Sequence, residues 1–412
     1  MVDEAEDNNQ LAISRRQFLR RSALAVAAAG LNQSALSSAV RAVVISGPAK
    51  KVLVLGAGLA GLVAAYELSK LGHDVTVLEA RTRPGGRVHT LREPFSDGLY
   101  AEAGAARIPD NHDLTHKYVK EFELPLEPFY PSRLSALRFD RDSREEVPIS
   151  GYTDAMTRQF GEDLGGNPDR WQKIKGGTDL LPKAFADRLG NKIHYGSPVV
   201  KIEQDEKQAR VVFLNAGRRQ TMTADDVLCT IPFSVLRKVE LPMLSAKKKD
   251  VIKDTHYDAV ARVYLQTRNR IWEEKGLNGF AFTKGAVEIW QPTWSQSGPR
   301  GILMTYARPG EAERITKLKE NERIATTLKQ LDEMFGGVRD GFERGATKCW
   351  TEDEWSRGAW AFVGFNNLAT ATSAEGRIHF AGEHMSAWVS WMQGALSSGL
   401  RAVKEIDEAA RV

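Results

Sequence analysis

The chain has 412 residues, of which 42% are hydrophobic and 8% aromatic, which is enough for one to three domains with packed cores. Its formal net charge is only +4 and no long block carries one sign, so we expect no nucleic acid as a partner. The eight histidines and the two cysteines, Cys229 and Cys349, show no metal-ligand spacing. We therefore expect no metal, and two free, buried cysteines rather than a disulfide.

The first 42 residues do not read as part of the fold. Residues 14–20 have the sequence SRRQFLR and precede a small-residue apolar run at 23–30, and Ala42 is a candidate cleavage point. Residues 1–42 resemble a twin-arginine signal peptide, a route associated with cargo that folds, often around a cofactor, before export. The apolar run is too short to span a bilayer, and no other stretch is predicted to do so. The resemblance predicts a periplasmic or secreted protein that uses the twin-arginine export machinery. A disordered basic tail is the alternative.

A strand, a helix and a second strand are predicted next, over residues 51–55, 59–71 and 74–78. The strands are apolar along most of their length, as in a parallel sheet that is covered on both faces. The helix has apolar residues at helical spacing and ends at Gly72. Together they predict one βαβ unit.

The turn between this strand and helix carries the pattern G-x-G-x-x-G at Gly56, Gly58 and Gly61. Gly56 permits the tight turn, Gly58 lets the backbone approach a pyrophosphate, and Gly61 lets helix and strand pack closely. Glu79 follows the second strand, where an acid accepts hydrogen bonds from a ribose. The helix amino terminus favours phosphate, so the unit predicts a bound dinucleotide. The alternative is a purely structural glycine turn.

Residues 80–87, with the sequence ARTRPGGR, distinguish between two dinucleotides. Gly85, Gly86 and Arg87 would place more backbone and one positive charge near the pyrophosphate. An NAD-dependent dehydrogenase does not need this second segment, so the sequence favours FAD.

The rest of the chain alternates between segments typical of two different sheets. An antiparallel meander is predicted over 199–202, 209–214 and 220–223. Core strands are predicted at 226–232 and 377–381, and strands of a second sheet at 260–265, 287–290 and 301–307. One or two amphipathic helices are expected over 311–335, and Met392, Ala395, Leu396, Val403 and Ile406 form the apolar stripe of a closing helix. A dinucleotide domain interrupted by a substrate domain follows from this order.

The segment LEARTRPGGR, residues 78–87, resembles the flavin amine oxidase superfamily, which includes monoamine, polyamine and L-amino acid oxidases. Further motifs agree in the family's order: GAARIP at 104–109, PVVKI at 198–202, HFAGEH at 379–384 and SWMQGA at 390–395. The resemblance covers most of the chain after the leader and is strongest to bacterial L-amino acid oxidases.

The resemblance implies an α/β fold with a Rossmann-type FAD-binding domain of the glutathione-reductase kind, including the meander. This discontinuous domain would comprise residues 50–110, 176–240 and 370–412. An interrupting α+β substrate domain with a mixed sheet would comprise 111–175 and 241–369. The family usually inserts a helical subdomain before residues 176–185, but little room remains between Tyr130 and Trp171, so we expect a reduced one. The substrate funnel would then be open or completed by a second subunit as a homodimer, unless the chain is trimmed.

The cofactor implied is FAD, bound non-covalently because no cysteine lies in the carboxy-terminal flavin motif. Val199 would hold adenine through its backbone, Glu383 would hold the ribityl chain or ribose, and the helix that begins at Trp391 would stabilise negative charge on reduced flavin. The FAD-binding residues predicted by motif and resemblance are Gly56, Gly58, Leu59, Ala60, Gly61, Glu79, Ala80, Arg81, Gly85, Gly86, Arg87, Gly104, Ala105, Ala106, Arg107, Val199, Gly382, Glu383, Trp391 and Met392.

The resemblance places Arg107 where L-amino acid oxidases hold the substrate carboxylate, and a guanidinium fork matches a carboxylate in two bonds. The alternative is an arginine that binds phosphate or an internal acid. Trp391 would form one wall of an aromatic cage over the flavin, and Trp388 could line the same mouth. An aromatic-rich cavity is further suggested by Phe282, Trp290, Trp294 and Trp360.

Three positions depart from the family pattern. Arg262 stands where many members have a lysine beside flavin N5, and arginine is bulkier and stays protonated, which bears on flavin reoxidation. Trp355 replaces a tyrosine that assists carboxylate binding, and it lacks the hydroxyl. Ser390 replaces a common glycine and narrows the space near the substrate amine.

These residues predict an FAD-dependent L-amino acid oxidase. It would transfer a hydride from Cα to flavin N5 and release a 2-oxo acid, ammonium and, with O₂ as acceptor, hydrogen peroxide. The predicted catalytic residues are Arg107, Arg262 and Trp391, and the predicted substrate-binding residues are Arg107, Trp355, Trp388, Ser390 and Trp391. A primary amine or polyamine oxidase and a flavin-binding protein without turnover are the alternatives, and a decarboxylating variant similar to tryptophan monooxygenases is a further one.

Overall fold

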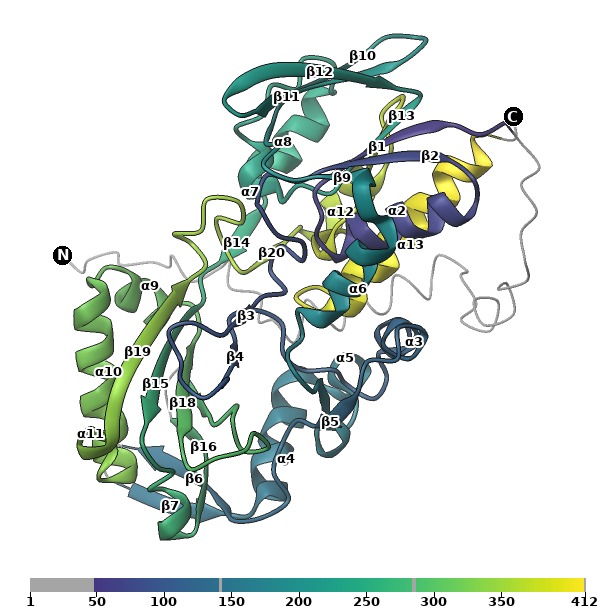
Figure 1. Cartoon of the computed structure of the whole chain (residues 1–412). Helices are drawn as coiled ribbons and strands as arrows, with labels where there is room; N and C mark the ends of the chain where they lie inside the picture. The colour runs from purple at the N-terminus through teal and green to yellow at the C-terminus, as the bar shows by residue number, and fades with distance from the viewer. Residues whose placement is uncertain (1–47, 141–142, 284–286, 411–412) are drawn as a thin grey trace, which may run out of the picture.

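The computed structural model describes residues 48–140, 143–283 and 287–410. The predicted signal peptide, residues 1–42, lies outside these ranges. Two sheets dominate the described chain, a five-stranded one and a seven-stranded one, and they occupy opposite ends of the molecule (Figure 1). Within the described residues, no helix combines the length and the apolar composition needed to cross a membrane.

The five-stranded sheet is entirely parallel. Its strands, in spatial order, are β21 (Ile378–Phe380), β13 (Asp226–Cys229), β1 (Lys51–Leu55), β2 (Asp74–Leu78) and β9 (Ile193–His194). They come from the beginning, the middle and the end of the chain, and each edge strand joins the sheet by a long crossover. The order and direction confirm the predicted Rossmann-type fold.

Strand β1 is apolar on both sides because both faces of the sheet are covered. Val52 and Val54 pack in one buried cluster with helices α2 (Leu59–Lys70) and α13 (Met392–Glu408). Leu53 and Leu55 pack in a second cluster with the antiparallel meander. The meander consists of β10 (Val199–Gln204), β11 (Ala209–Asn215) and β12 (Arg218–Ala224), as predicted.

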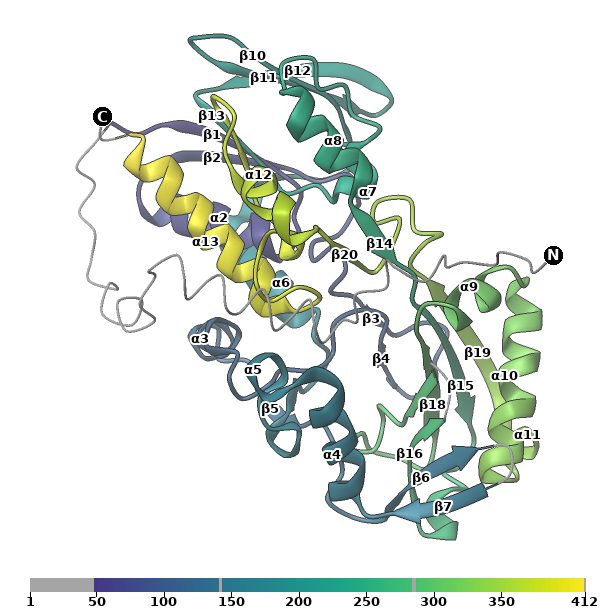
Figure 2. The same ribbon diagram turned by 180° about the vertical axis from the view of Figure 1, so that it is seen from behind.

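Helices α2 and α13 lie side by side although they are at opposite ends of the chain, as both views show (Figures 1 and 2). Gly399 makes this close approach feasible, since a Cβ there would lie 2.5 Å from the carbonyl oxygen of Ala60. The closing helix therefore completes the first βαβ unit instead of forming a separate layer.

The seven-stranded sheet is mixed. Its order is β19 (Phe342–Cys349), β15 (Ala261–Thr267), β18 (Gly301–Ala307), β17 (Val287–Trp290), β16 (Leu277–Thr283), β6 (Ser135–Asp140) and β7 (Ser143–Val147). All neighbours are antiparallel except β16 and β6. Strands β6, β7, β16 and β19 were not predicted, whereas the strands at 260–265, 287–290 and 301–307 are confirmed within two residues.

The two faces of this sheet have different chemistry. One face packs aliphatic residues against α10 (Glu320–Phe335), which lies next to α9 (Glu311–Thr316) and α11 (Val338–Gly341) (Figure 2). The amphipathic segment predicted over 311–335 therefore forms two helices, α9 and α10. The other face carries Tyr264, Trp290 and Tyr306 in an aromatic cluster that also includes Trp391. This aromatic face points toward the rest of the molecule and forms part of the cleft described below.

Among the described residues between Tyr130 and Trp171, the α-helices are α4 (Ile149–Phe160) and α5 (Glu162–Gly165), which follow strands β6 and β7, as expected for a reduced helical subdomain. Cys229 and Cys349 are buried and free.

The division into two domains at the residue numbers given above stays a prediction. The other elements are α3 (Asp113–Glu121), α6 (Leu180–Leu189), α7 (Phe233–Leu236), α8 (Ala246–Asp254), α12 (Leu368–Thr372), β3 (Thr90–Leu91), β4 (Ala101–Glu102), β5 (Leu126–Pro128), β8 (Gln172–Ile174), β14 (His256–Asp258) and β20 (Trp360–Phe362).

Candidate active site

Within the described residues, a long cleft runs from the carboxyl ends of β1 and β2 to the aromatic face of the seven-stranded sheet, and the empty space along it, including open solvent at its mouth, amounts to about 1510 Å³. A parallel sheet of this kind binds ligands at this edge. The predicted site residues that line the cleft are Gly56, Gly58, Leu59, Ala60, Glu79, Ala80, Arg81, Gly85, Gly86, Arg87, Gly104, Ala105, Ala106, Arg107, Val199, Arg262, Trp355, Gly382, Glu383, Ser390, Trp391 and Met392. The fold thus brings together residues from eight separate stretches of sequence.

Glycines form the wall at the dinucleotide end. Gly56 and Gly85 have φ of +105° and +98°, a region that favours glycine. A Cβ on Gly61 would lie 2.0 Å from the carbonyl oxygen of Gly56, so this glycine is required for helix packing and does not itself line the cleft. A Cβ on Gly58, in contrast, would meet no described atom within 4 Å. Gly58 therefore leaves a space that a side chain would fill, as a pyrophosphate site requires.

Glu79 is 6% exposed, and its two oxygens accept from the backbone N–H groups of Ala57 at 2.6 Å and Arg81 at 2.8 Å. Burial raises the pKa of this carboxyl above its usual value, and the two backbone hydrogen bonds oppose the shift. These bonds fix the carboxylate at the end of β2, where a ribose hydroxyl can donate to it.

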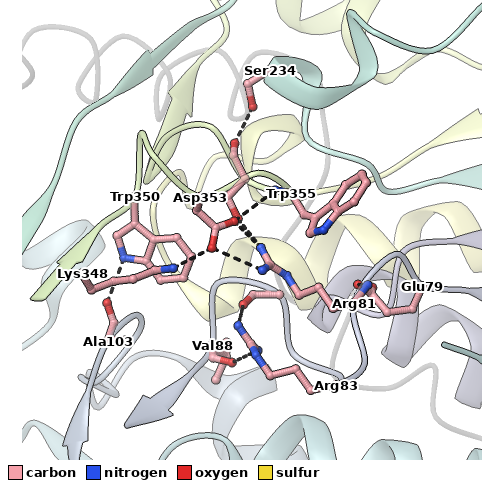
Figure 3. Close-up of polar contacts among 12 residues, drawn as sticks. Glu79, Arg81, Arg83, Val88, Ala103, Ser234, Lys348, Trp350, Asp353 and Trp355 are labelled. Atoms are coloured by element: carbon pink, nitrogen blue, oxygen red, sulfur yellow. Dashed lines mark hydrogen bonds and ion pairs between the residues drawn. The ribbon is translucent and has the colours of Figure 1, made fainter. Parts of the chain in front are cut away.

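Arg81 is held by an acid that the sequence did not reveal (Figure 3). Its Nη2 donates to Asp353 Oδ1 at 2.5 Å, and Lys348 Nζ donates to Asp353 Oδ2 at 2.6 Å. Burial opposes ionisation of Asp353, but the hydrogen bonds from Arg81 and Lys348 prevail and hold its pKa well below the usual range. Asp353 also accepts from the backbone N–H of Trp355 at 3.2 Å. The acid therefore ties the loop that carries Trp355 to the dinucleotide end of the cleft.

Arg87 and Glu383 form a second ion pair along the cleft, with 2.8 Å between Nη1 and Oε1. The other oxygen of Glu383 accepts from the backbone N–H of Ser390 at 2.8 Å. Ser390 has φ of +73°, which L-residues other than glycine adopt at a cost, in agreement with the glycine that the resemblance leads us to expect there. Glu383 thus holds the turn that leads into α13.

Helix α13 begins at the cleft. Trp391 is its N-cap residue, and Met392 and Ala395 line the cleft within the first turn. Among the described residues, no side chain caps this end, so its first N–H groups and the positive end of the helix dipole face the ligand space.

Arg107 lies at the other end and is 8% exposed. Its Nη1 is 3.6 Å from Oε2 of Glu288, yet it has no hydrogen-bond partner within the described part of the chain. The guanidinium carbon lies 4.8–5.9 Å from the centroids of five aromatic rings, those of Phe160, Trp171, Trp290, Tyr306 and Trp391. An internal acid is therefore nearby, as the alternative interpretation required, but it leaves this donor unsatisfied.

Arg262 lines the same end and is 5% exposed. Its Nη1 donates to the carbonyl oxygen of Glu102 at 2.6 Å, and its guanidinium carbon lies 4.8 Å from the centroid of the Tyr306 ring. A neutral carbonyl leaves the charge of Arg262 uncompensated by this contact.

A sequence profile described as "Flavin containing amine oxidoreductase" matches residues 59–149 and 152–407. The chain belongs to this family. Among its relatives, "Putative L-amino-acid oxidase YobN" of Bacillus subtilis (strain 168) is 31% identical over 455 positions, covering 87% of this chain and 95% of that protein. "Flavin-dependent L-tryptophan oxidase RebO" of Lentzea aerocolonigenes is 30% identical, and the alignment covers 87% of this chain and 98% of that protein.

Solved structures of two amine oxidases share the fold. Wild-type putrescine oxidase bound to putrescine superimposes with a TM-score of 0.75 at 21% identity, over 87% of this chain and 99% of that one. Cyclohexylamine oxidase from Brevibacterium oxydans IH-35A superimposes with a TM-score of 0.75 at 18% identity, over 88% of this chain and 99% of that one. The 455 aligned positions of the Bacillus relative exceed the 412 residues of this chain, so that relative has segments without a counterpart here.

The cleft of this flavin amine oxidoreductase fits FAD. Gly58 and its neighbours leave room for the pyrophosphate, and Glu79 is fixed in place to accept from the ribose. The positive end of the α13 dipole faces the ligand space farther along the cleft. No cysteine occurs among the described residues that line the cleft, in agreement with non-covalent binding.

Two predictions about this site need correction. Trp388 does not line the cleft; its ring stands edge-on to His112 with 5.1 Å between centroids. Gly61 packs inside the helix turn instead of facing the ligand space. Of the aromatic residues suggested for the cavity, Trp290 and Trp360 line it, whereas Phe282 and Trp294 pack behind it. Tyr306 and Trp350 also line it and were not predicted. Tyr306 lies two residues after Met304 in strand β18, so the two side chains share the aromatic face of the sheet, and this period of two was the signal that the sequence offered.

Proposed function

We propose that this flavin amine oxidoreductase oxidises L-amino acids. In the overall reaction an L-amino acid, O₂ and water give a 2-oxo acid, ammonium and hydrogen peroxide. The observation that carries the proposal is Arg107, a buried guanidinium in the cleft whose Nη1 forms no hydrogen bond to any described residue. A substrate carboxylate would satisfy that donor, whereas a simple amine has no group to do so. The relatives named as L-amino-acid and L-tryptophan oxidases support the same choice.

FAD, when bound, supplies the acceptor for the hydride that leaves the substrate Cα. The chain contributes binding and orientation. Arg107 would bind the carboxylate, and the rings of Trp391, Trp290 and Tyr306 around it would exclude water and restrict the substrate to one pose. Arg262 would keep a second positive charge at this end of the cleft. Trp355 and Ser390, which also line the cleft, would limit the space around the substrate.

Peroxide release measured with matched pairs tests this proposal. Tryptophan and tryptamine, or arginine and agmatine, differ only by the carboxylate. We expect the amino acid to have the higher kcat/KM by about 100-fold, because a charge-assisted bidentate pair is worth roughly 3 kcal/mol. Preference for the amine would support a primary amine or polyamine oxidase instead. Failure of every amine and amino acid to bleach the flavin band without oxygen would leave a flavin-binding protein without turnover.

We also propose export by the twin-arginine route, on the basis of SRRQFLR at 14–20. Replacing Arg15 and Arg16 together with lysine should retain the protein in the cytoplasm, as cell fractionation would reveal; unchanged export would contradict this. A homodimer that completes the substrate funnel is a further proposal, and light scattering of the purified protein tests it.

A further inference from the structure

A buried charge cluster lies behind the substrate end of the cleft and consists of Arg107, Glu288 and Arg308. Glu288 is on β17 and is 4% exposed, and Arg308 follows directly after the end of β18, which pairs with β17. Two guanidinium groups therefore share one carboxylate, and the cluster carries one net positive charge when all three groups are ionised.

The two arginines do not share that carboxylate equally. Oε1 of Glu288 accepts a hydrogen bond from Nη2 of Arg308, and Oε2 accepts one from the indole N–H of Trp290 at 3.0 Å. Arg107 is 3.6 Å from Oε2 and forms no hydrogen bond through its Nη1 to any described residue. Glu288 is thus engaged by Arg308 and Trp290, and the excess positive charge belongs to Arg107.

We propose that Arg308 is a positioning residue that keeps Arg107 available for the substrate carboxylate by engaging Glu288. This inference rests on the proposed function, because it assigns the ligand of Arg107. Without Arg308, Glu288 is the nearest acid to Arg107, and a small shift would bring the two groups into direct hydrogen-bonded contact. An incoming carboxylate would then compete with an internal one and meet like-charge repulsion in a buried site. With Arg308 in place, Arg107 and Arg308 face one anion, Glu288, before the substrate binds. After binding they face two, because the substrate carboxylate is added.

Calorimetry on the FAD-loaded protein measures this effect without turnover. The probe is 3-phenylpropionate, which has a carboxylate and no amine to oxidise, and its neutral amide is the control ligand. We expect Arg308→Leu to weaken binding of the acid by about tenfold or more and to leave the amide unchanged. Arg308→Lys keeps the cation and should stay within about threefold of the wild type. Arg314→Leu is the matched control, because Arg314 pairs with Glu311 at a side chain that is 55% exposed.

Kinetics provide the second readout. In Arg308→Leu the KM for L-amino acids should rise by about tenfold while kcat changes less, because the substrate pose against the flavin is unaltered once the carboxylate binds. A purely structural role for Arg308 would lower kcat and the thermal midpoint together and would weaken both ligands.

A double variant isolates the carboxylate of Glu288. In a Glu288→Gln background no anion can turn toward Arg107, so adding Arg308→Leu should cost less than about threefold in binding of the acid. A full tenfold loss in that background would overturn the inference. If Arg308→Leu does not fold, Arg308→Gln keeps a long polar side chain and answers the same question.

The outcomes separate the two proposals. If the wild type prefers the acid over the amide and Arg308→Leu shows the same preference, the role of Arg308 is overturned and the proposed function stands. Wild-type protein that binds both probes equally overturns both.

Discussion

Two arginines at opposite ends of one cleft show how the same type of side chain can have a structural role or a ligand-binding role. Arg81 at the dinucleotide end bonds to Asp353 at 2.5 Å and to the hydroxyl of Ser356 at 3.0 Å. Arg107 at the substrate end is packed among aromatic rings, and its nearest acid is engaged by other donors. A buried cation whose bonds are complete holds the protein together, whereas one with an unsatisfied donor gains by binding an anion.

The two ends also differ in what builds them. Backbone geometry dominates the dinucleotide end, since glycines at positive φ and backbone N–H groups form its wall. Side chains from β15, β17, β18 and the N-cap of α13 form the substrate end. Substitutions should therefore act through cofactor retention and stability at the first end, and through substrate affinity at the second.

The largest effect is expected for Arg107→Met at the substrate end. Loss of a charge-assisted bidentate pair costs roughly 3 kcal/mol, so the KM for L-amino acids should rise by about 100-fold, with flavin content unchanged. Steady-state peroxide release measures it, and the corresponding amine is the control because it has no carboxylate to lose. An unchanged KM would remove the substrate assignment.

Gly58→Val tests the dinucleotide end. Because a Cβ at this position meets no described atom within 4 Å, the variant should fold and yet lose FAD, with flavin content falling by about tenfold or more. Gly61→Val is the matched comparison. Its Cβ would lie 2.0 Å from the carbonyl oxygen of Gly56, so overpacking should lower stability by about 2 kcal/mol or more. Absorbance ratios and thermal unfolding separate the two, and a yellow Gly58→Val protein would contradict the expectation.

Asp353→Asn should break the contact between the Trp355 loop and Arg81. We expect a loss of about 2–3 kcal/mol in the free energy of unfolding at neutral pH, because Arg81 and Lys348 lose their shared carboxylate. The folded-state pKa of Asp353 is depressed, so its contribution is complete above the unfolded value of about 3.9 and is lost as pH falls below it. The gap between wild type and variant in urea titrations should narrow below about pH 4. Ser356→Ala removes one neutral partner and should cost about 1 kcal/mol or less.

The smallest effect is expected for Glu102→Gln, which lies between the two ends. Burial raises the pKa of Glu102 to about 7, against an unfolded value of about 4.3, so the folded state holds its proton more tightly. Wild-type protein should then lose roughly 2 kcal/mol of stability as the pH rises from about 5 to about 7, and the variant should not. Activity should persist, because Arg262 bonds to the backbone carbonyl of Glu102 and not to its carboxylate. Parallel pH profiles for the two proteins would refute this expectation.

The sequence by itself determined the dinucleotide half, because that half depends on local patterns. The G-x-G-x-x-G turn, the apolar strands beside it, Glu79 and the meander are each encoded within a few consecutive residues. The same holds for the start of α13 at Trp391 and for the position of Arg107, which the motif resemblance supplied.

In the substrate half, three strands of the sheet and Arg107 could be predicted from the sequence, and the tertiary structure decided the rest. Strand β7 has the sequence SREEV and β19 has FERGATKC; both are edge strands with polar faces, so neither shows a strand pattern of its own. Strand β7 is held by antiparallel pairing with β6, and β19 by pairing with the distant strand β15. Asp353 meets Arg81, and Glu288 meets Arg107, across large separations in sequence, whereas Arg308 reaches Glu288 from the neighbouring strand. Trp388 is three residues from Trp391 and both rings stand edge-on to His112, yet of the two only Trp391 lines the cleft. The helix begins only at Met392, and Ser390 turns the chain between the two tryptophans at positive φ. Local periodicity fixes where a strand or helix lies, whereas the partner of a buried charge depends on which distant segments the fold brings together.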